Sequence, residues 1–330
     1  MKHFFTTLLS VCIVSQVLTA QVTDAEKTLR TVATDSTKGW KKGGVISITG
    51  ANTELYNWAA GGNNTLSANG LTSIFLNYKS PTTAWDNLFD FGYGRTRQGE
   101  KGKPFLKTDD KIDLLSKYGH KAYKSFYYAA LVNFKTQFDE GRKYTNDTTY
   151  SIISNFLAPA YITGAIGIDY KPNKYFSAFV APVTARYTIV NDQKLADAGA
   201  FGVEKAIYAT DGITKLKDGE NVRKEFGGYV RIIITKNDFS QELLKNVSLT
   251  SKVDLFSNYL QSPENVDVSW ENQIAFKINK FITVNFNTHL INDADTKNVG
   301  LDTNNDGTDD KMVSKVQFKQ LLGVGFSYKF

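Results

Sequence analysis

Residues 316–330 read VQFKQLLGVGFSYKF, and this stretch decides the fold. Its even-numbered positions are apolar or aromatic apart from Gln320, whereas most of its odd-numbered positions are polar or glycine. Because side chains alternate along a strand with a period of two, the pattern predicts a strand with one apolar face. A soluble sandwich would bury that face in a core, whereas a membrane barrel would turn it toward lipid.

The same alternation recurs along the chain between turn-forming residues. It predicts strands at residues 43–57, 65–79, 84–96, 107–118, 122–138, 155–171, 174–190, 223–236, 245–260, 265–279, 281–292 and 314–330. Short and long connections alternate strictly between these strands, which is typical of an outer-membrane barrel with short periplasmic turns and longer outer loops. The sequence therefore predicts an all-β, antiparallel transmembrane β-barrel of about twelve strands in the outer membrane of a Gram-negative bacterium.

The beginning of the chain has a different pattern. Residues 1–20 combine a charged start, a mostly apolar run and a polar continuation after Ala20, which predicts a cleaved signal peptide. Residues 21–42 are polar and are expected to form a periplasmic lead-in, so the barrel is assigned to residues 43–330.

Cys12 is the only cysteine, and it falls inside the expected signal peptide. A lipoprotein site there is disfavoured by Val11, because a small residue normally precedes a lipidated cysteine. The exported chain would then contain no cysteine, so disulfide bonds could not stabilise it.

Composition excludes some partners. The net charge is +6, and the 39 basic and 33 acidic residues are scattered without a basic block, so no nucleic-acid partner is expected. Mean hydropathy is −0.30, and no apolar run after the signal peptide approaches the ~20 residues of a membrane helix. Barrel strands escape such a search because half of their residues face the lumen.

The polar strand faces carry charges of both signs. We expect these residues to line the lumen: Asp113, Lys117, Lys135, Asp169, Glu225, Arg231, Lys252, Asp254, Asp267, Glu271 and Lys277. One interpretation is a porin-like barrel that passes or binds a small polar or ionic solute. The alternative is a non-conducting barrel, closed by salt bridges, with a structural or biogenesis role beside a protein partner. Twelve strands lie between filled eight-stranded and open sixteen-stranded barrels, so both interpretations stay open.

Residues 302–310 read DTNNDGTDD and match the first half of a calcium-binding loop. The candidate oxygen ligands are those of Asp302, Asn304, Asp306 and Asp309. Val313 stands where an EF-hand has its bidentate glutamate, so a hydrophilic outer loop is the alternative. No other cofactor is expected.

Two histidines remain after removal of the signal peptide. His120 is predicted to lie in a short turn, and His289 on the lumen face near the outer end of its strand. A hydrolase at the membrane rim would need a serine and an orienting group beside His289. Serines such as Ser257 are numerous and no G-x-S-x-G motif occurs, so we expect no enzymatic activity.

Several short motifs occur together along the chain. They are NWAAGG at 57–62, DKID at 110–113, KTQF at 135–138, FLAPAY at 156–161, GIDYKP at 167–172, RKEFG at 223–227, LFSNY at 255–259 and NVDVSWE at 265–271. Taken together, the chain resembles the domain-of-unknown-function 3078 family of Bacteroidota. The resemblance implies a Gram-negative envelope protein, and it supplies no activity or functional residues.

The last strand is expected to close the barrel by pairing with the segment around Ile46 and Ile48, so that no backbone edge is left in lipid. Phe330 resembles the terminal aromatic residue that barrel-assembly machinery recognises. The expected partners are therefore outer-membrane lipid and lipopolysaccharide, the barrel-assembly machinery and an unidentified envelope protein.

Overall fold

The computed structural model describes residues 38–56, 63–146, 148–236, 238–241, 244–279, 282–295, 299–301 and 311–329. Nearly all regular structure in these residues is antiparallel β-sheet, which confirms the predicted all-β class. The expected signal peptide, the calcium-like stretch 302–310 and Phe330 lie outside the described residues.

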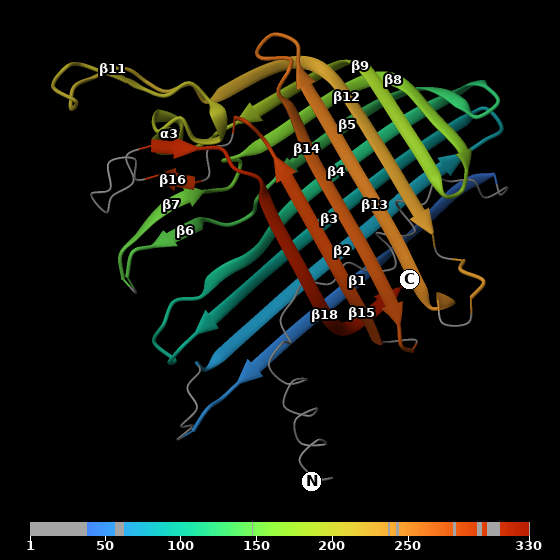
Figure 1. The fold of residues 1–330 in the computed structure, drawn as a ribbon, viewed down its shortest axis with the longest axis horizontal. Helices are drawn as coiled ribbons and strands as arrows, with labels where there is room; N and C mark the ends of the chain where they lie inside the picture. The colour runs from blue at the N-terminus through green and yellow to red at the C-terminus, as the bar shows by residue number, and fades with distance from the viewer. Residues whose placement is uncertain are drawn as a thin grey trace.

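Twelve long strands pair with their neighbours in one closed barrel (Figure 1). They are β1 (Gly39–Thr53), β2 (Thr65–Lys79), β3 (Thr83–Gln98), β4 (Leu106–Tyr123), β5 (Phe126–Thr136), β8 (Ala160–Asn173), β9 (Phe176–Ile189), β12 (Val222–Lys236), β13 (Val247–Asn258), β14 (Val266–Lys277), β15 (Ile282–Asn292) and β18 (Gln317–Lys329). The connections alternate between tight turns, such as residues 124–125 and 174–175, and longer loops.

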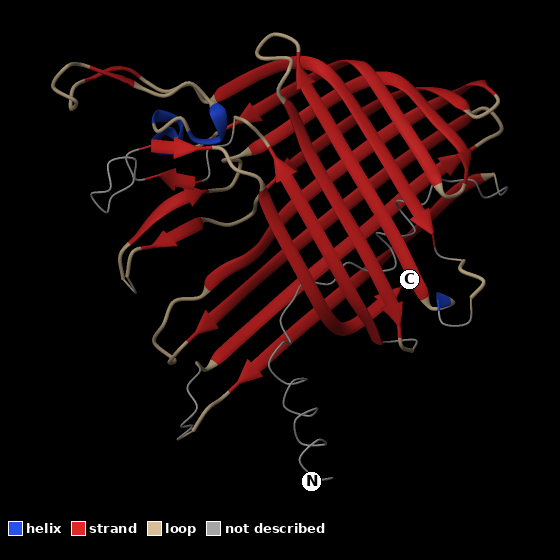
Figure 2. Cartoon of the chain, viewed as in Figure 1, coloured by secondary structure: helices blue, strands red, loops and turns tan. Residues whose placement is uncertain are grey.

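The longer loops contain structure that the sequence patterns did not predict. In the described part of these loops there are three hairpins and two short helices: β6 (Gly141–Tyr144) with β7 (Tyr150–Ser154), β10 (Ile207–Tyr208) with β11 (Lys215–Lys217), β16 (Val299–Leu301) with β17 (Lys311–Val313), α3 (Gln193–Asp197) and the 3-10 helix η1 (Ala200–Gly202). Figure 2 shows these elements gathered at one end of the barrel. That end is called the loop end below, and the opposite end is called the turn end.

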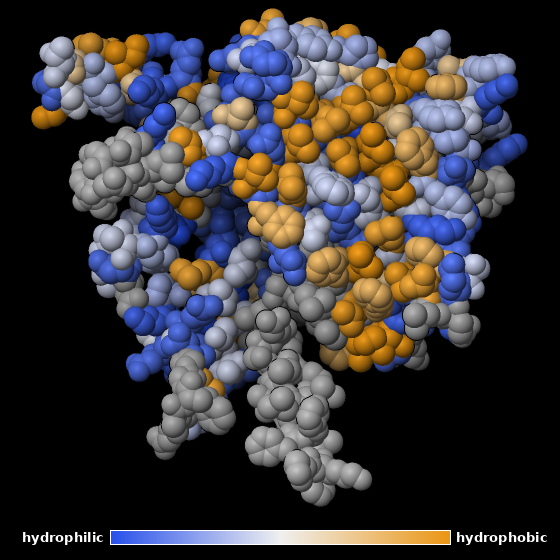
Figure 3. Space-filling model, viewed as in Figure 1, coloured by the Kyte–Doolittle hydropathy of each residue, from blue (hydrophilic) through white to orange (hydrophobic). Residues whose placement is uncertain are grey.

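The strand faces alternate as their sequences do. In β5, Tyr128 and Val132 are exposed on the outer wall, whereas Leu131 and Asn133 are buried inside. Exposed apolar residues cover much of the outer wall (Figure 3). No helix in the described part of the chain is long and apolar enough to cross a membrane.

Pro182 lies within β9, where a proline would ordinarily interrupt the ladder. In the ladder with β12, Thr184 pairs with Gly227 and the next pair is Ala181 with Tyr229. Two residues of β9 therefore lie opposite the single residue Gly228 of β12, so β9 has one extra residue at this point. The ladder with β8 shifts at the same place. Pro182 therefore occupies a bulge, where its missing N–H group is tolerated.

Several strand boundaries differ from the predictions. β1 runs from Gly39 to Thr53 where residues 43–57 were predicted, so residues 39–42 belong to the barrel and not to the expected periplasmic lead-in. His120, predicted in a turn, pairs with Thr83 and Tyr128 inside β4, because the hairpin turns only at residues 124–125. The strand predicted at residues 155–171 begins later, at Ala160, directly after Pro159.

The barrel closes where β1 meets β18. Four residue pairs join these strands, from Val45–Lys329 to Ile48–Phe326, and they include the segment around Ile46 that the last strand was expected to meet. By comparison, β1 pairs with β2 along all fifteen of its residues. Figure 1 shows β1 and β18 diverging from their short ladder toward the loop end. We call this ladder the seam.

Candidate functional site

The barrel interior is the candidate site, because the polar faces of the strands meet there. The structure places these predicted lumen residues in ion pairs: Asp113, Lys117, Lys135, Asp169, Glu225, Arg231, Lys252, Asp254, Asp267 and Glu271. Lys277 differs, because it is exposed at the turn end of β14 and belongs to none of the interior clusters in the described residues.

A first cluster lies toward the turn end and centres on Asp169. This carboxylate is 1% exposed and lies 2.6 Å from Lys117 Nζ and 3.1 Å from Lys171 Nζ. The Ser177 hydroxyl donates a third hydrogen bond to it, and Lys171 reaches on to Asp86 at 3.4 Å. Two lysines thus balance two aspartates, as a buried ionic group requires.

A second cluster lies at the middle of the interior. Arg231 donates to both oxygens of Asp254, at 2.6 and 3.2 Å, and the Tyr229 hydroxyl donates to the same carboxylate at 2.7 Å. Lys252 pairs with Glu271 at 2.5 Å. Arg231 and Lys252 are only 7% and 6% exposed, so this cluster is desolvated.

Looser pairs follow β4 and β5. Lys111 lies 3.7 Å from Asp90 and 3.8 Å from Asp113, and Lys135 also lies 3.8 Å from Asp113. The Asn133 amide donates to Asp113 at 2.6 Å. These ammonium groups attract the carboxylates at distances longer than a hydrogen bond.

A third cluster lies toward the loop end, around Glu225. Arg186 donates to both of its carboxylate oxygens, at 2.8 and 2.7 Å, and also to Asp267 at 2.7 Å. Arg223 bonds Glu225 at 2.8 Å and forms a close ion pair with Asp295. We call these five residues the Glu225 cluster.

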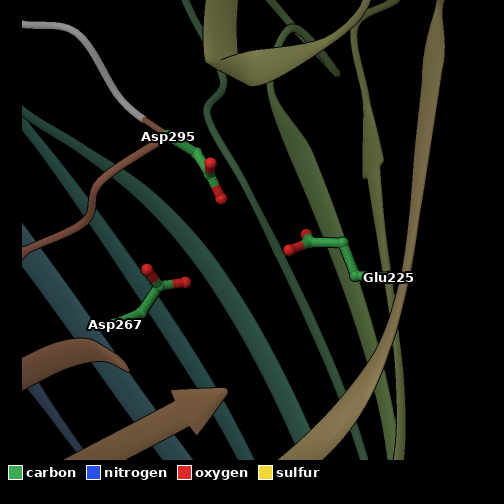
Figure 4. A group of neighbouring side chains, drawn as sticks. All are labelled: Glu225, Asp267 and Asp295. Carbon is green, nitrogen blue, oxygen red and sulfur yellow. The ribbon is translucent and has the colours of Figure 1, made fainter. Parts of the chain in front are cut away.

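Three carboxylates of the Glu225 cluster converge, as Figure 4 shows for Glu225, Asp267 and Asp295. Their nearest oxygens lie within 4.8 Å of one another, a separation that could hold a metal ion. However, the two arginine side chains already bond these oxygens. The geometry therefore describes a closed ion-pair cluster.

An apolar cluster inside the barrel was missed from the sequence. Leu131, Phe179, Tyr229 and Phe256 are all at most 8% exposed and pack with small alanines on neighbouring strands. The sequence contained a sign of this cluster. Phe256 occupies an even-numbered position of β13, as the inward-facing Lys252 and Asp254 do, so its side chain is expected to point inward too. An inward aromatic residue fills the lumen and does not face lipid.

Two of the cavities lined by the described residues lie inside the barrel. The smaller, about 70 Å³, is toward the turn end and includes Asp86, Lys117 and Lys171 in its lining. The larger, about 180 Å³, includes Tyr161, Arg186 and Asp267. Arg231 lines both cavities, so the Arg231–Asp254 pair lies between them.

The histidine expected on the lumen face has one side-chain hydrogen-bond partner among the described residues. His289 Nε2 lies 2.9 Å from the Ser269 hydroxyl, whereas the Ser257 hydroxyl donates to the carbonyl of Pro263. Among the side chains that the structure describes, no carboxylate or amide accepts from the other ring nitrogen of His289. A hydrolytic triad needs that third group.

Comparison with known proteins finds one matching family model, over part of the chain. Residues 50–141 match the family described as "Protein of unknown function (DUF3078)", which confirms the resemblance over that segment. No curated protein matches the chain.

Thirteen chains of solved structures match, and two of them are autotransporter domains of low sequence identity. The translocator domain of the autotransporter NalP from Neisseria meningitidis has 9% identity and a TM-score of 0.39, with 90% of each chain covered. The β domain of the Bordetella autotransporter BrkA has 8% identity and a TM-score of 0.30, with 89% of this chain and 98% of that chain covered. At these scores the likeness carries no argument about activity.

Proposed function

We propose that the protein is a twelve-stranded outer-membrane β-barrel that holds a small polar solute in its lumen and does not let solutes diffuse freely through it. The observation that carries this proposal is the ion-paired layer between the two cavities, with Arg231 and Asp254 at its centre. Buried, paired charges resist separation, because removing either partner leaves an uncompensated charge.

The membrane location is supported by the outer wall. Ile48 on β1, Val132 on β5 and Ile166 on β8 are 71%, 56% and 64% exposed. An apolar outer surface that extends over so many strands would be unfavourable in water. Paired strands also satisfy the backbone groups that lipid cannot. Outer-membrane lipid, lipopolysaccharide and the barrel-assembly machinery are the partners that this location implies.

The proposal is tested by recording from the purified barrel in planar lipid bilayers. We expect the wild type to give no current steps, and Arg231→Ala combined with Asp254→Ala to give reproducible steps, because both charges of the central pair are removed together. Lys174→Ala with Asp238→Ala removes an exposed pair between two turns and should stay silent. Steps of equal size in the wild type and the Arg231/Asp254 variant would reject a closed lumen.

A second candidate function is a structural or biogenesis role beside another envelope protein. The hairpin of β10 and β11 favours it, because Ile213 is 84% exposed and Leu216 is 66% exposed at the loop end. A photo-crosslinking side chain at position 213 should then give one discrete adduct in intact cells, and the same side chain at Glu100 should give none. Adducts of the same mass at both positions would reject a partner at the hairpin.

A further inference from the structure

Aromatic side chains form a row on the outer wall near the turn end. Trp40 on β1 lies opposite Tyr78 on β2, Tyr78 lies opposite Trp85 on β3, and Trp85 lies opposite Tyr118 on β4. Figure 1 shows these four strands side by side. Trp40, Trp85 and Tyr118 are 54%, 39% and 46% exposed. In membrane barrels, such a band of aromatic rings lies at the level of the lipid headgroups.

The ring of Trp85 is held in place by its neighbours. Its Nε1 atom donates to Ser116 Oγ at 2.9 Å, and that hydroxyl donates to Asn87 Oδ1 at 2.7 Å. Trp40 packs beside it with the ring centroids 5.8 Å apart, and beside Tyr78 with the centroids 5.2 Å apart. Trp40, Tyr78 and Trp85 therefore form a preorganised surface, which we call the aromatic triplet.

Lys42 is a cation on the same outer face. The ladder of β1 and β2 has no register shift, so Lys42 points to the same side as Trp40, Ile46 and its opposite residue Leu76. Lys42 is exposed, and Ile46 and Leu76 are 46% and 45% exposed. A charge on this wall is unfavourable in the hydrocarbon region of a membrane, so the ammonium group of Lys42 needs the headgroup region.

Three hydrogen-bond donors at this place have no acceptor in the part of the chain that the structure describes. They are the ammonium group of Lys42, the indole N–H of Trp40 and the hydroxyl of Tyr78. The indole N–H of Trp85 differs, because Ser116 accepts from it. No described carboxylate forms an ion pair with Lys42 either. The chemical group that complements these donors has several acceptor oxygens and a negative charge.

We propose that Lys42 and the aromatic triplet bind the headgroup of an anionic phospholipid of the phosphatidylglycerol class. The phosphate accepts hydrogen bonds from Lys42, Trp40 and Tyr78, and the acyl chains extend along Leu76 and Ile46 toward the middle of the barrel. A zwitterionic headgroup would bring its own ammonium group close to Lys42, so the anionic class is favoured. The short turns face the periplasm in the expected orientation, so the lipid belongs to the inner leaflet and is not lipopolysaccharide. This assignment rests on the proposed function only for the membrane location.

Native mass spectrometry of the purified barrel, released from detergent micelles that contain one added lipid, tests the assignment. The lipids are dioleoyl phosphatidylglycerol, dioleoyl phosphatidylethanolamine and lipid A, and the dissociation constant of the first adduct is measured for each. We expect phosphatidylglycerol to bind at least about tenfold more tightly than phosphatidylethanolamine, since a hydrogen bond to a charged group is worth about that factor or more.

Three variants locate the binding. Lys42→Gln should weaken phosphatidylglycerol binding about tenfold or more and leave the affinity for lipid A unchanged. Trp40→Phe and Tyr78→Phe keep an aromatic ring but remove one donor, so each should weaken it about threefold or more. Lys124→Gln is the control, because it removes an exposed lysine of the same end, in the turn between β4 and β5, and should bind as the wild type does. Heat-modifiable gel migration like that of the wild type shows that each variant is folded.

The possible failures are distinguishable. Equal affinity for the two phospholipids in the wild type, or equal losses in Lys42→Gln and Lys124→Gln, would overturn the lipid site. An equal loss of lipid A affinity in Lys42→Gln would overturn the inner-leaflet phospholipid as its occupant. Flotation of the barrel with phosphatidylcholine vesicles tests the membrane location by itself, and a barrel that does not float would overturn both that location and the lipid site.

Discussion

Glu225 lies at the centre of the Glu225 cluster, because it forms ion pairs with both of its arginines. Its side chain is 1% exposed and bonds both Arg186 and Arg223, so Glu225→Gln leaves two buried guanidinium groups short of one negative charge. We expect the free energy of unfolding to fall by about 3 kcal/mol, as for other broken buried pairs. Unfolding in urea, followed by tryptophan fluorescence of the barrel in detergent micelles, measures the change.

A matched control for Glu225→Gln is Glu204→Gln in the loop after β9. Glu204 is 81% exposed and lies 3.9 Å from Lys217, so its replacement should change the free energy of unfolding by less than about 0.5 kcal/mol. Equal destabilisation by the two substitutions would show that the Glu225 cluster adds no stability beyond that of an exposed pair.

At the residue scale, the sequence predicted which side chains face inward but not which side chains meet. Parity alone places Asp169 and Lys252 on the inner face, because a strand has only two sides. The partners of these residues depend on register and on the curvature of the barrel: Lys117 and Asp169 are 52 positions apart. Lys277 has the inward parity but lies at a strand end, where that parity no longer ensures burial.

The ladder between β8 and β9 depends on a glycine at position 167. A Cβ atom there would lie 2.0 Å from the carbonyl oxygen of Val180, a backbone atom that cannot move without shifting the bulge at Pro182. We expect Gly167→Ala to reduce the folded fraction, measured as the heat-modifiable band on a gel. Gly164→Ala lies in the same strand with open space around it and should assemble normally. Normal assembly of both variants would show that the bulge can move.

The loop between β9 and β12 should depend on pH through Asp197. Its carboxylate accepts hydrogen bonds from Lys215, Gln193 and the Gly219 backbone, and in that order these lower its pKa to about 2. The stabilisation is therefore complete above the ordinary pKa of about 4 and is lost as the pH falls through about 2.

Pepsin cleavage of residues 190–221 measures this dependence. At a pH near the ordinary value, Asp197→Asn should be cleaved faster than the wild type, and below pH 2 the two rates should converge because the wild-type carboxylate is then protonated. The ratio of the two rates removes the pH dependence of pepsin itself. Asp218→Asn, at a 68% exposed partner of Lys215, is the control and should match the wild type. A constant ratio across this range would contradict the role of Asp197.

At the element scale, the long strands were predictable because each repeats a two-residue period many times. Strands β2 and β15 begin and end within one residue of their predicted bounds. The hairpins in the loops were not predictable, because β10 and β11 have two and three residues, too few for a period to appear. The inward aromatic residues were missed because an apolar side chain has the same pattern whether it meets lipid or fills the lumen.

Closure of the whole barrel can be checked by cross-linking across the seam. Ser47 and Ser327 are opposite each other in the ladder of β1 and β18, so Ser47→Cys with Ser327→Cys should form a disulfide on oxidation. Cys12→Ser removes the only native cysteine first. Ser47→Cys with Ser177→Cys places the second cysteine on β9, across the barrel, and should stay reduced. Failure of the first pair to cross-link in membranes would contradict closure.

At the scale of the whole molecule, the alternation of short turns and long loops predicted the arrangement of the connections. The closed lumen that we propose was not predictable from the sequence, because charges of both signs suit a water-filled channel as well as an ion-paired interior. The distances favour the proposed ion-paired interior, because Lys117 lies 2.6 Å from the carboxylate of Asp169, which is 1% exposed.

The seam also has a consequence for the order in which the protein folds. Of the barrel strands, β1 and β18 are the farthest apart in sequence, so bringing them together has the largest entropic cost of loop closure. Only four residue pairs of the described ladder offset this cost. Every other ladder can form between strands that are closer in sequence and can form first. The last step of folding is then the meeting of β1 and β18, and before it the protein is a curved open sheet with two bare edges. Such edges invite pairing with other chains, so a nascent barrel is most prone to aggregation just before it is complete.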